Sequence, residues 1–224
     1  MTAVATAGRT STSPATDRAA ALVLAVLMPV GPALVAVLRG LLPGFTAGDS
    51  RQVAAAVAAS PGRESAVLWL GYLATLMLVP GVIAAAGLAR KGAPRLAAWA
   101  VTLLVPGYLS MGALLTGDAV LWAGQSAGLP TATTAALYDH LHPSIDLAVG
   151  VFVVGHVAGT VLLGLALLRS RAIPAPFAWV LTVSQPLHFA AFVVFGIQTL
   201  DVVAWTLTAV GMAAAAVALV RRPG

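Results

Sequence analysis

Six long apolar runs, none with a charged residue in its middle, limit most strongly what this chain can fold into. They lie near 19–39, 65–89, 96–117, 145–168, 175–197 and 201–220, and each supplies about the 20 apolar residues that a bilayer crossing needs. Lipid cannot hydrogen-bond to a backbone, so each run must form a helix or part of a closed barrel. Their apolarity is continuous rather than alternating, which excludes the barrel. The sequence predicts an all-α, polytopic membrane bundle of six transmembrane helices.

The composition agrees with lipid as the main solvent. Charged residues make up 8% of the 224 residues, against about 25% in an average soluble domain. The absence of cysteine removes disulfides, thiolate metal sites and thiol nucleophiles. The net charge of +5 comes from basic groups at the ends of the apolar runs, and no basic stripe with interleaved aromatics indicates nucleic acid. The expected partner is the lipid bilayer, and the sequence identifies neither a protein partner nor an oligomeric state.

Basic residues indicate the orientation of the runs. Nine of the 12 lysines and arginines lie before the first run, between the second and third, between the fourth and fifth, or after the sixth. Because cytoplasmic loops are enriched in basic residues, this asymmetry places both termini in the cytoplasm. Residues 1–17 are then expected to form a disordered cytoplasmic tail, and residues 18–224 the six-helix transmembrane domain.

Two of the predicted spans share a residue pattern. Span three has Pro94, Ala98, Trp99, Thr102 and Pro106, and span five has Pro174, Ala178, Trp179, Thr182 and Pro186. Short stretches at 49–59 and 131–141 precede the second and fourth spans, and each is expected to form a helix on the outer surface. We interpret the chain as three repeated helical hairpins, related by an axis along the membrane normal. Pro29, Pro106 and Pro186 would then kink the odd-numbered spans.

Two histidines inside the predicted spans are the candidate cofactor-binding residues. His156 and His188 lie ~16 Å and ~14 Å below the outer ends of consecutive antiparallel helices. In one hypothesis the pair ligates haem b or a metal ion, or lines a solute path. In the other, each neutral ring bonds a nearby hydroxyl or carbonyl and holds helices together, and the sequence favours this hypothesis. Gly155 and Gly159 flank His156 and are expected to permit close helix packing.

No residue is assigned to catalysis or to a metal site. Residues 124–128 fit the pattern G-x-S-x-G, which forms a nucleophile site only between a strand and a helix. In an all-helical chain we expect this stretch in an outer loop, as a chance match. A zinc site normally takes three or four ligands, and the deep histidine pair has no third. Asp146 and Asp201 fall in the first turns of predicted helices, where the helix dipole explains them.

Several stretches together have a familiar pattern. They are Gly155-His156-Val157-Ala158-Gly159, the following 168–174, and Gln185-Pro186-Leu187-His188 ahead of Asp201 and Trp205. The chain resembles uncharacterised six-helix integral membrane proteins of high-GC bacteria, a domain of unknown function. The resemblance implies the fold and the bacterial cytoplasmic membrane, and it implies no activity.

The sequence leaves the molecular activity open between three classes. The leading hypothesis is a non-enzymatic accessory, sensory or small-solute protein. The alternatives are a membrane redox protein that uses His156 and His188, and a channel or facilitated transporter for a small neutral solute.

Overall fold

Helices make up the regular structure of the described chain. A computed structural model describes residues 14–45 and 48–221. The elements are α1 (Pro14–Leu41), α2 (Ser50–Ala59), α3 (Pro61–Ala89), α4 (Pro94–Ser126), α5 (Thr131–Asp139), α6 (Ser144–Arg169), α7 (Ala175–Phe189), the π-helical η1 (Ala190–Phe195) and α8 (Gln198–Val220). Six helices are long and apolar enough to cross a membrane, with α7 and η1 counted as one. The predicted all-α bundle with six candidate spans is confirmed.

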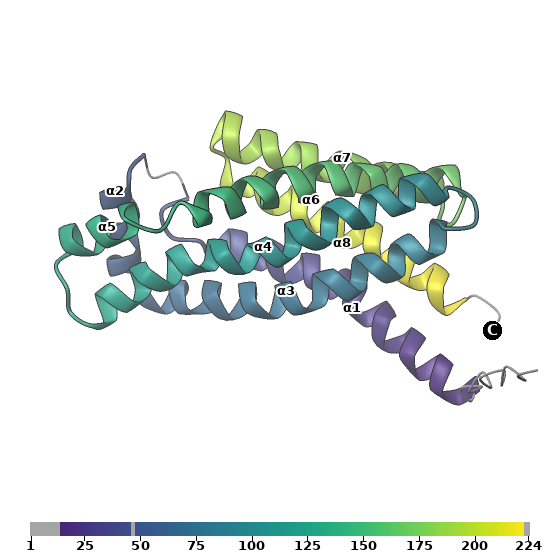
Figure 1. Ribbon diagram of the computed structural model, residues 1–224, viewed down its shortest axis with the longest axis horizontal. Coiled ribbons are helices and arrows are strands. Elements are labelled where there is room, and N and C mark those ends of the chain that lie inside the picture. The colour runs from purple at the N-terminus through teal and green to yellow at the C-terminus, as the bar shows by residue number, and fades with distance from the viewer. Residues whose placement is uncertain (1–13, 46–47, 222–224) are drawn as a thin grey trace, which may run out of the picture.

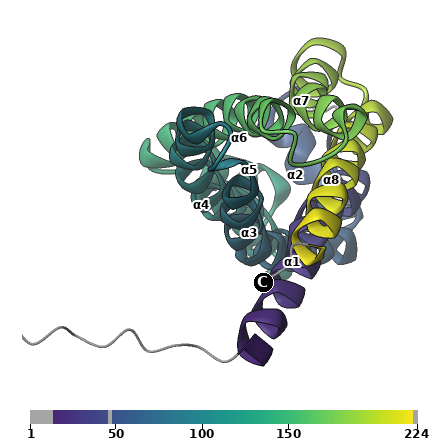
Figure 2. The same cartoon turned by 90° about the vertical axis from the view of Figure 1, so that its right-hand side faces the viewer.

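The six long helices form a ring in chain order. Each packs against the next, and α8 returns to pack along α1. Figure 2, which views the molecule along its long axis, shows this arrangement. The two short helices α2 and α5 pack against each other and against α4 at the end of the ring opposite to where α8 ends (Figure 1). We call this the α2–α5 end.

The helices extend past several predicted boundaries. The segment expected as a tail ended at residue 17, whereas α1 begins at Pro14, because the fixed φ of proline suits the first turn of a helix. Residues 1–13 of that segment lie outside the described residues. The predicted end of span three was residue 117, but α4 continues to Ser126. The first three residues of the G-x-S-x-G match, 124–126, therefore lie in a helix rather than in the expected outer loop.

Packing against α5 explains the longer α4. A Cβ atom on Gly124 would lie 2.6 Å from the Thr134 hydroxyl, so the absence of a side chain there lets the two helices meet. The helices α2 and α5 occupy the stretches 49–59 and 131–141, which were predicted to be helical. They cover the same end of the ring.

The prolines expected to kink the odd-numbered spans all lie inside helices. Pro29 is in α1, Pro106 in α4 and Pro186 in α7. Past Pro186, α7 widens into the π-helical η1 and stops at Gly196, whose φ of 63° is in the left-handed region that favours glycine. This short connection brings the first turn of α8 next to the last turn of α7.

Side chains from two other helices bond to the last carbonyl groups of α1. The Gln198 amide donates to the carbonyl of Arg39 at 2.7 Å. The Arg63 side chain donates to the carbonyls of Leu41 at 3.0 Å and Gly40 at 3.4 Å. The last carbonyls of a helix lack partners inside the helix, and in an apolar setting each unpaired group is costly. These bonds therefore tie the end of α1 to α3 and α8.

Two glycines bring α4 and α6 into backbone contact. A Cβ atom on Gly155 would lie 2.6 Å from the Leu103 carbonyl oxygen and 2.8 Å from the Gly107 Cα. Gly159 lies one turn further on and leaves room for the Leu104 side chain, 2.6 Å from its ideal Cβ position. Small residues at a helix interface permit such close packing in membranes.

Gly155→Ala is expected to destabilise the bundle, because the new methyl group meets backbone atoms that cannot move aside alone. We expect a loss of about 1–3 kcal/mol, the usual cost of overpacking. Thermal unfolding of the purified protein in mild detergent would measure it. The matched control is Gly150→Ala on the same helix, where the added Cβ meets nothing within 4 Å. Equal stability of the two variants would contradict the close contact.

Candidate functional site

The α2–α5 end of the ring encloses a cavity of about 590 Å³. Side chains from α1, α4, α6, α7 and α8 form its walls, and α2, α5 and η1 contribute at the same end. The lining is mostly apolar and also holds the ionisable side chains Arg39, Asp118, Asp139, Asp146 and His188. The cavity is therefore the place where the ring offers both space and chemistry.

A buried ionic cluster joins three helices at the floor of this cavity. Asp201 of α8 is 0% exposed. One carboxylate oxygen accepts a hydrogen bond from Nε of Arg39 in α1, and the other accepts from Nδ1 of His188 in α7. With Nδ1 held by the carboxylate, Nε2 is the ring nitrogen that His188 can offer to the cavity.

Aromatic rings enclose the Arg39 guanidinium. It lies 4.9 Å from the ring centroid of Phe45 and 4.7 Å from that of Phe192. A guanidinium at this distance from an aromatic face is attracted by the ring quadrupole, and more strongly where water is excluded. Arg39 is thus stabilised by an opposite charge on one side and by two rings around it.

His156 lies deeper and is fully buried. Its Nδ1 is 2.5 Å from the Phe152 carbonyl oxygen. The Phe152 ring stacks on it at a centroid distance of 4.2 Å, and the Trp205 ring stacks at 5.8 Å. Neither Nε2 of His156 nor Nε1 of Trp205 has a hydrogen-bond partner among the described residues.

The structure brings the two predicted histidines together. Their ring centroids are 5.2 Å apart and the rings are inclined by 54°. An iron ion held between two imidazoles, each about 2 Å from a ring nitrogen, would set the centroids about 6 Å apart with a porphyrin between them. The observed pair is closer than that. Aromatic rings also stack on His156, so the pair as it lies does not fit a haem held between the two rings.

A metal ion would need more ligands than the pair provides. Across residues 14–45 and 48–221, no group of three or more His, Cys, Asp or Glu side chains is placed to hold one. The nearby carboxylate of Asp201 is already bonded to Arg39 and His188.

The polar neighbours of His188 in α7 bond to another helix. The Gln185 amide donates to the Thr208 hydroxyl at 2.7 Å, and that hydroxyl donates to Ser184 at 2.8 Å. Ser184 and Gln185 therefore join α7 to α8, and the partner of His188 is the Asp201 carboxylate rather than a hydroxyl or carbonyl group.

Sequence reasoning missed the charged members of this cluster. Asp201 was explained by the helix dipole alone, and Arg39, in the last turn of α1, was not named as a site residue. Glu64, in the first turn of α3, was not named either, yet it is 1% exposed and its Oε1 has no hydrogen-bond partner in the described part of the chain. The one signal in the sequence was the small number of charged residues in or near the predicted spans, which makes each of them a candidate for a buried pair.

Carboxylates dominate the electrostatics near the cavity mouth. Burial raises the pKa of Tyr138 in α5 above its ordinary value, and the charges of Asp118, Asp139 and Asp146 raise it further. Three carboxylates from three different helices therefore act on one phenol that lines the cavity.

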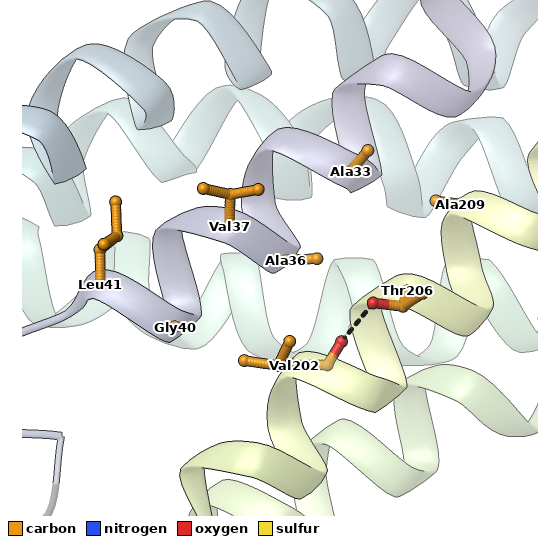
Figure 3. A pocket seen from close by; sticks show the side chains of 8 residues that line it. All are labelled: Ala33, Ala36, Val37, Gly40, Leu41, Val202, Thr206 and Ala209. Carbon is orange, nitrogen blue, oxygen red and sulfur yellow. Dashed lines mark hydrogen bonds between the residues drawn. The ribbon is translucent and has the colours of Figure 1, made fainter.

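A second hollow, of about 500 Å³, lies between α1 and α8 on the outside of the ring. Figure 3 shows its small lining side chains, which include Ala33, Ala36 and Ala209. The Thr206 hydroxyl there donates to the Val202 carbonyl at 2.8 Å. Val37 at its edge is 53% exposed. The lining of this hollow is apolar and contains no ionisable side chain. The candidate functional site is therefore the cavity inside the ring.

Comparison with family models, with curated proteins and with solved structures found no match. Any assignment of function must therefore come from the geometry described above.

Asp201→Asn is expected to destabilise the protein by about 3–5 kcal/mol, because it removes the counter-charge of the Arg39 guanidinium, whose side chain is only 15% exposed. Chemical denaturation in mild detergent would measure the change. The control is the double variant Arg39→Met with Asp201→Leu, which removes both charges and should recover most of the loss. Native-like stability of Asp201→Asn alone would contradict the role of the pair.

Proposed function

We propose that this chain is a non-enzymatic membrane protein that binds a small molecule in the cavity at the α2–α5 end, as a sensory or small-solute protein. The observation that carries the proposal is the cavity itself. Its volume of about 590 Å³ falls within the roughly 300–1,000 Å³ of ligand sites, and its lining combines apolar walls with a few convergent polar groups.

The packing below the cavity supports a binding site over a channel. His188 and Trp205 are among the cavity-lining residues, whereas His156 beneath them is fully buried. The His156 ring is 0% exposed and has the Phe152 and Trp205 rings stacked on it. A solute would need these rings to move before it could pass deeper from the cavity.

The proposed location is the cytoplasmic membrane of a bacterium, with both termini inside and the α2–α5 end outside. The excess of basic residues at the opposite end supports this orientation. The bacterial location rests on the resemblance to six-helix membrane proteins of high-GC bacteria. In this orientation the cavity faces the outside of the cell.

The proposed hairpin repeat agrees with the ring. Its three hairpins would be α1 with α3, α4 with α6, and α7 with α8. The first two hairpins each hold a short helix between their long ones, α2 and α5, while the third has only the short connection through Gly196. A cavity that lies on the axis of such a ring receives side chains from every hairpin.

Leu129→Cys tests the orientation, because the native chain has no cysteine and Leu129 is 37% exposed at the α2–α5 end. A thiol reagent that cannot cross membranes is expected to label this variant in intact cells. Mass spectrometry of the purified protein would detect the label. If the cysteine is labelled only after the cells are lysed, the α2–α5 end faces the cytoplasm and the proposed orientation is wrong.

Leu114→Trp tests the binding site by filling the cavity, which Leu114 lines. Purified protein would be screened by thermal unfolding against a library of water-soluble small molecules. A ligand present at 100 times its Kd stabilises by about 2.7 kcal/mol. We expect this to raise the Tm by several degrees in the native protein and not in the variant.

The matched control for the screen is Leu109→Trp, which adds the same ring to the same helix at a position 59% exposed on the outside. It should keep the response to ligand. A library without any stabilising compound, or stabilisation that survives in Leu114→Trp, would contradict binding in the cavity.

A further inference from the structure

The charges around the cavity are unbalanced. Its lining holds three carboxylates, Asp118, Asp139 and Asp146, and a single guanidinium, that of Arg39. The charge of Arg39 is already matched by Asp201, which lies behind it in the floor. The three lining carboxylates are therefore left to determine the electrostatic potential of the space.

None of these three carboxylates has a salt bridge within residues 14–45 and 48–221, where the ion pairs are those of Asp201 with Arg39 and with His188. Asp139 accepts a hydrogen bond from the Ser50 hydroxyl at 2.8 Å, which holds it at the mouth. Asp118 lies deeper and acts electrostatically on Glu64, a buried carboxyl group with an unpartnered oxygen. Asp118 is half-buried, while Asp139 and Asp146 are exposed at the mouth. A half-buried carboxylate without a salt bridge is costly, and a bound cation would lower that cost.

Aromatic side chains lie on the same cavity surface. Tyr138 lines the cavity near Asp139, and Trp205 lines its floor with 1% exposure and an indole N–H that has no hydrogen-bond partner among the described residues. Aromatic faces attract organic cations.

We infer that the ligand of this cavity is a small organic cation, with its ammonium group beside Asp118, Asp139 and Asp146 and its apolar part against the aromatic floor. This inference rests on the proposed binding function and adds the chemical class of the ligand. It differs from the small neutral solute of the channel or transporter hypothesis, because Asp118, Asp139 and Asp146 line one cavity.

Charged thiol reagents can test the potential inside the cavity directly. Val149→Cys places a thiol on the cavity lining, and Leu129→Cys, at the same end and with the same 37% exposure of the native side chain, is the control outside the cavity. Each thiolate attacks a methanethiosulfonate, forms a mixed disulfide and releases methanesulfinate. The ratio of rates for the trimethylammonium-ethyl and sulfonato-ethyl reagents at one cysteine cancels its thiolate fraction.

We expect the cation-to-anion rate ratio at Val149→Cys to exceed that at Leu129→Cys by about tenfold or more, since clefts lined by one sign of charge concentrate the opposite ion. Adding Asp118→Asn should lower the ratio several-fold, whereas Asp49→Asn, outside the cavity, should leave it unchanged. A ratio equal to the control, or one that favours the anion, would overturn the inference.

Binding itself can be tested with three molecules of similar shape and different charge, by measuring how far each protects a cavity cysteine from labelling. Choline, the alcohol 3,3-dimethylbutan-1-ol and the carboxylate 3,3-dimethylbutanoate would compete with neutral methyl methanethiosulfonate at Val149→Cys. Choline should slow labelling at concentrations where the other two do not, and Asp118→Asn should weaken that protection. Protection by the alcohol or the carboxylate instead, or by none of the three, would overturn the cation assignment.

Labelling of Val149→Cys also distinguishes a failure of the cation inference from a failure of the proposed binding function. If neutral methyl methanethiosulfonate labels Val149→Cys rapidly but no charge preference exists, the open cavity of the proposed function stands and the cation inference fails. If this small neutral reagent labels Leu129→Cys and never reaches Val149→Cys, the cavity is closed and the proposed function fails with it.

Discussion

The ion pair between Arg39 and Asp201 connects the first and last long helices, and the cavity depends on that connection. A charge in the hydrocarbon region costs several kcal/mol unless it is paired, so α1 and α8 are most stable where the two side chains meet. Gln198 and Arg63 bond to the last carbonyls of α1 at the same place. These contacts close the ring, and a closed ring with a sharp turn at Gly196 presents His188 to a space on its axis.

The number and type of the helices could be predicted because lipid leaves the chain few alternatives. An apolar run of about 20 residues has one way to satisfy its backbone in a bilayer, so the six runs predict six helices. The boundaries of the helices were harder to predict from the sequence. The extension of α4 through Trp122 is helical because it packs on α5 through Gly124, and that contact joins segments whose pairing no local pattern reveals.

The candidate site could be predicted only in part. His156 and His188 stand out as titratable residues inside apolar runs, and the structure places their rings 5.2 Å apart. Arg39 and Asp201 are separated by 162 positions, and each by itself looks like an ordinary residue at the end of a helix. The same holds for the carboxylates of α4, α5 and α6 that line the cavity. These carboxylates lie close together because the ring of helices closes, and no sequence pattern within a single helix predicts that.

Closure between α1 and α8 also constrains how the protein is made. A ribosome delivers α1 before the other five long helices described, yet the counter-charge of Arg39 lies in α8, the last of these to emerge. Until then Arg39 has to extend toward the membrane interface, as long basic side chains near helix ends do. Insertion of the individual helices can follow synthesis in order, whereas completion of the ring has to wait until α8 has been inserted. A chain truncated before α8 would keep its earlier spans and expose the wall that α1 normally turns to its partner.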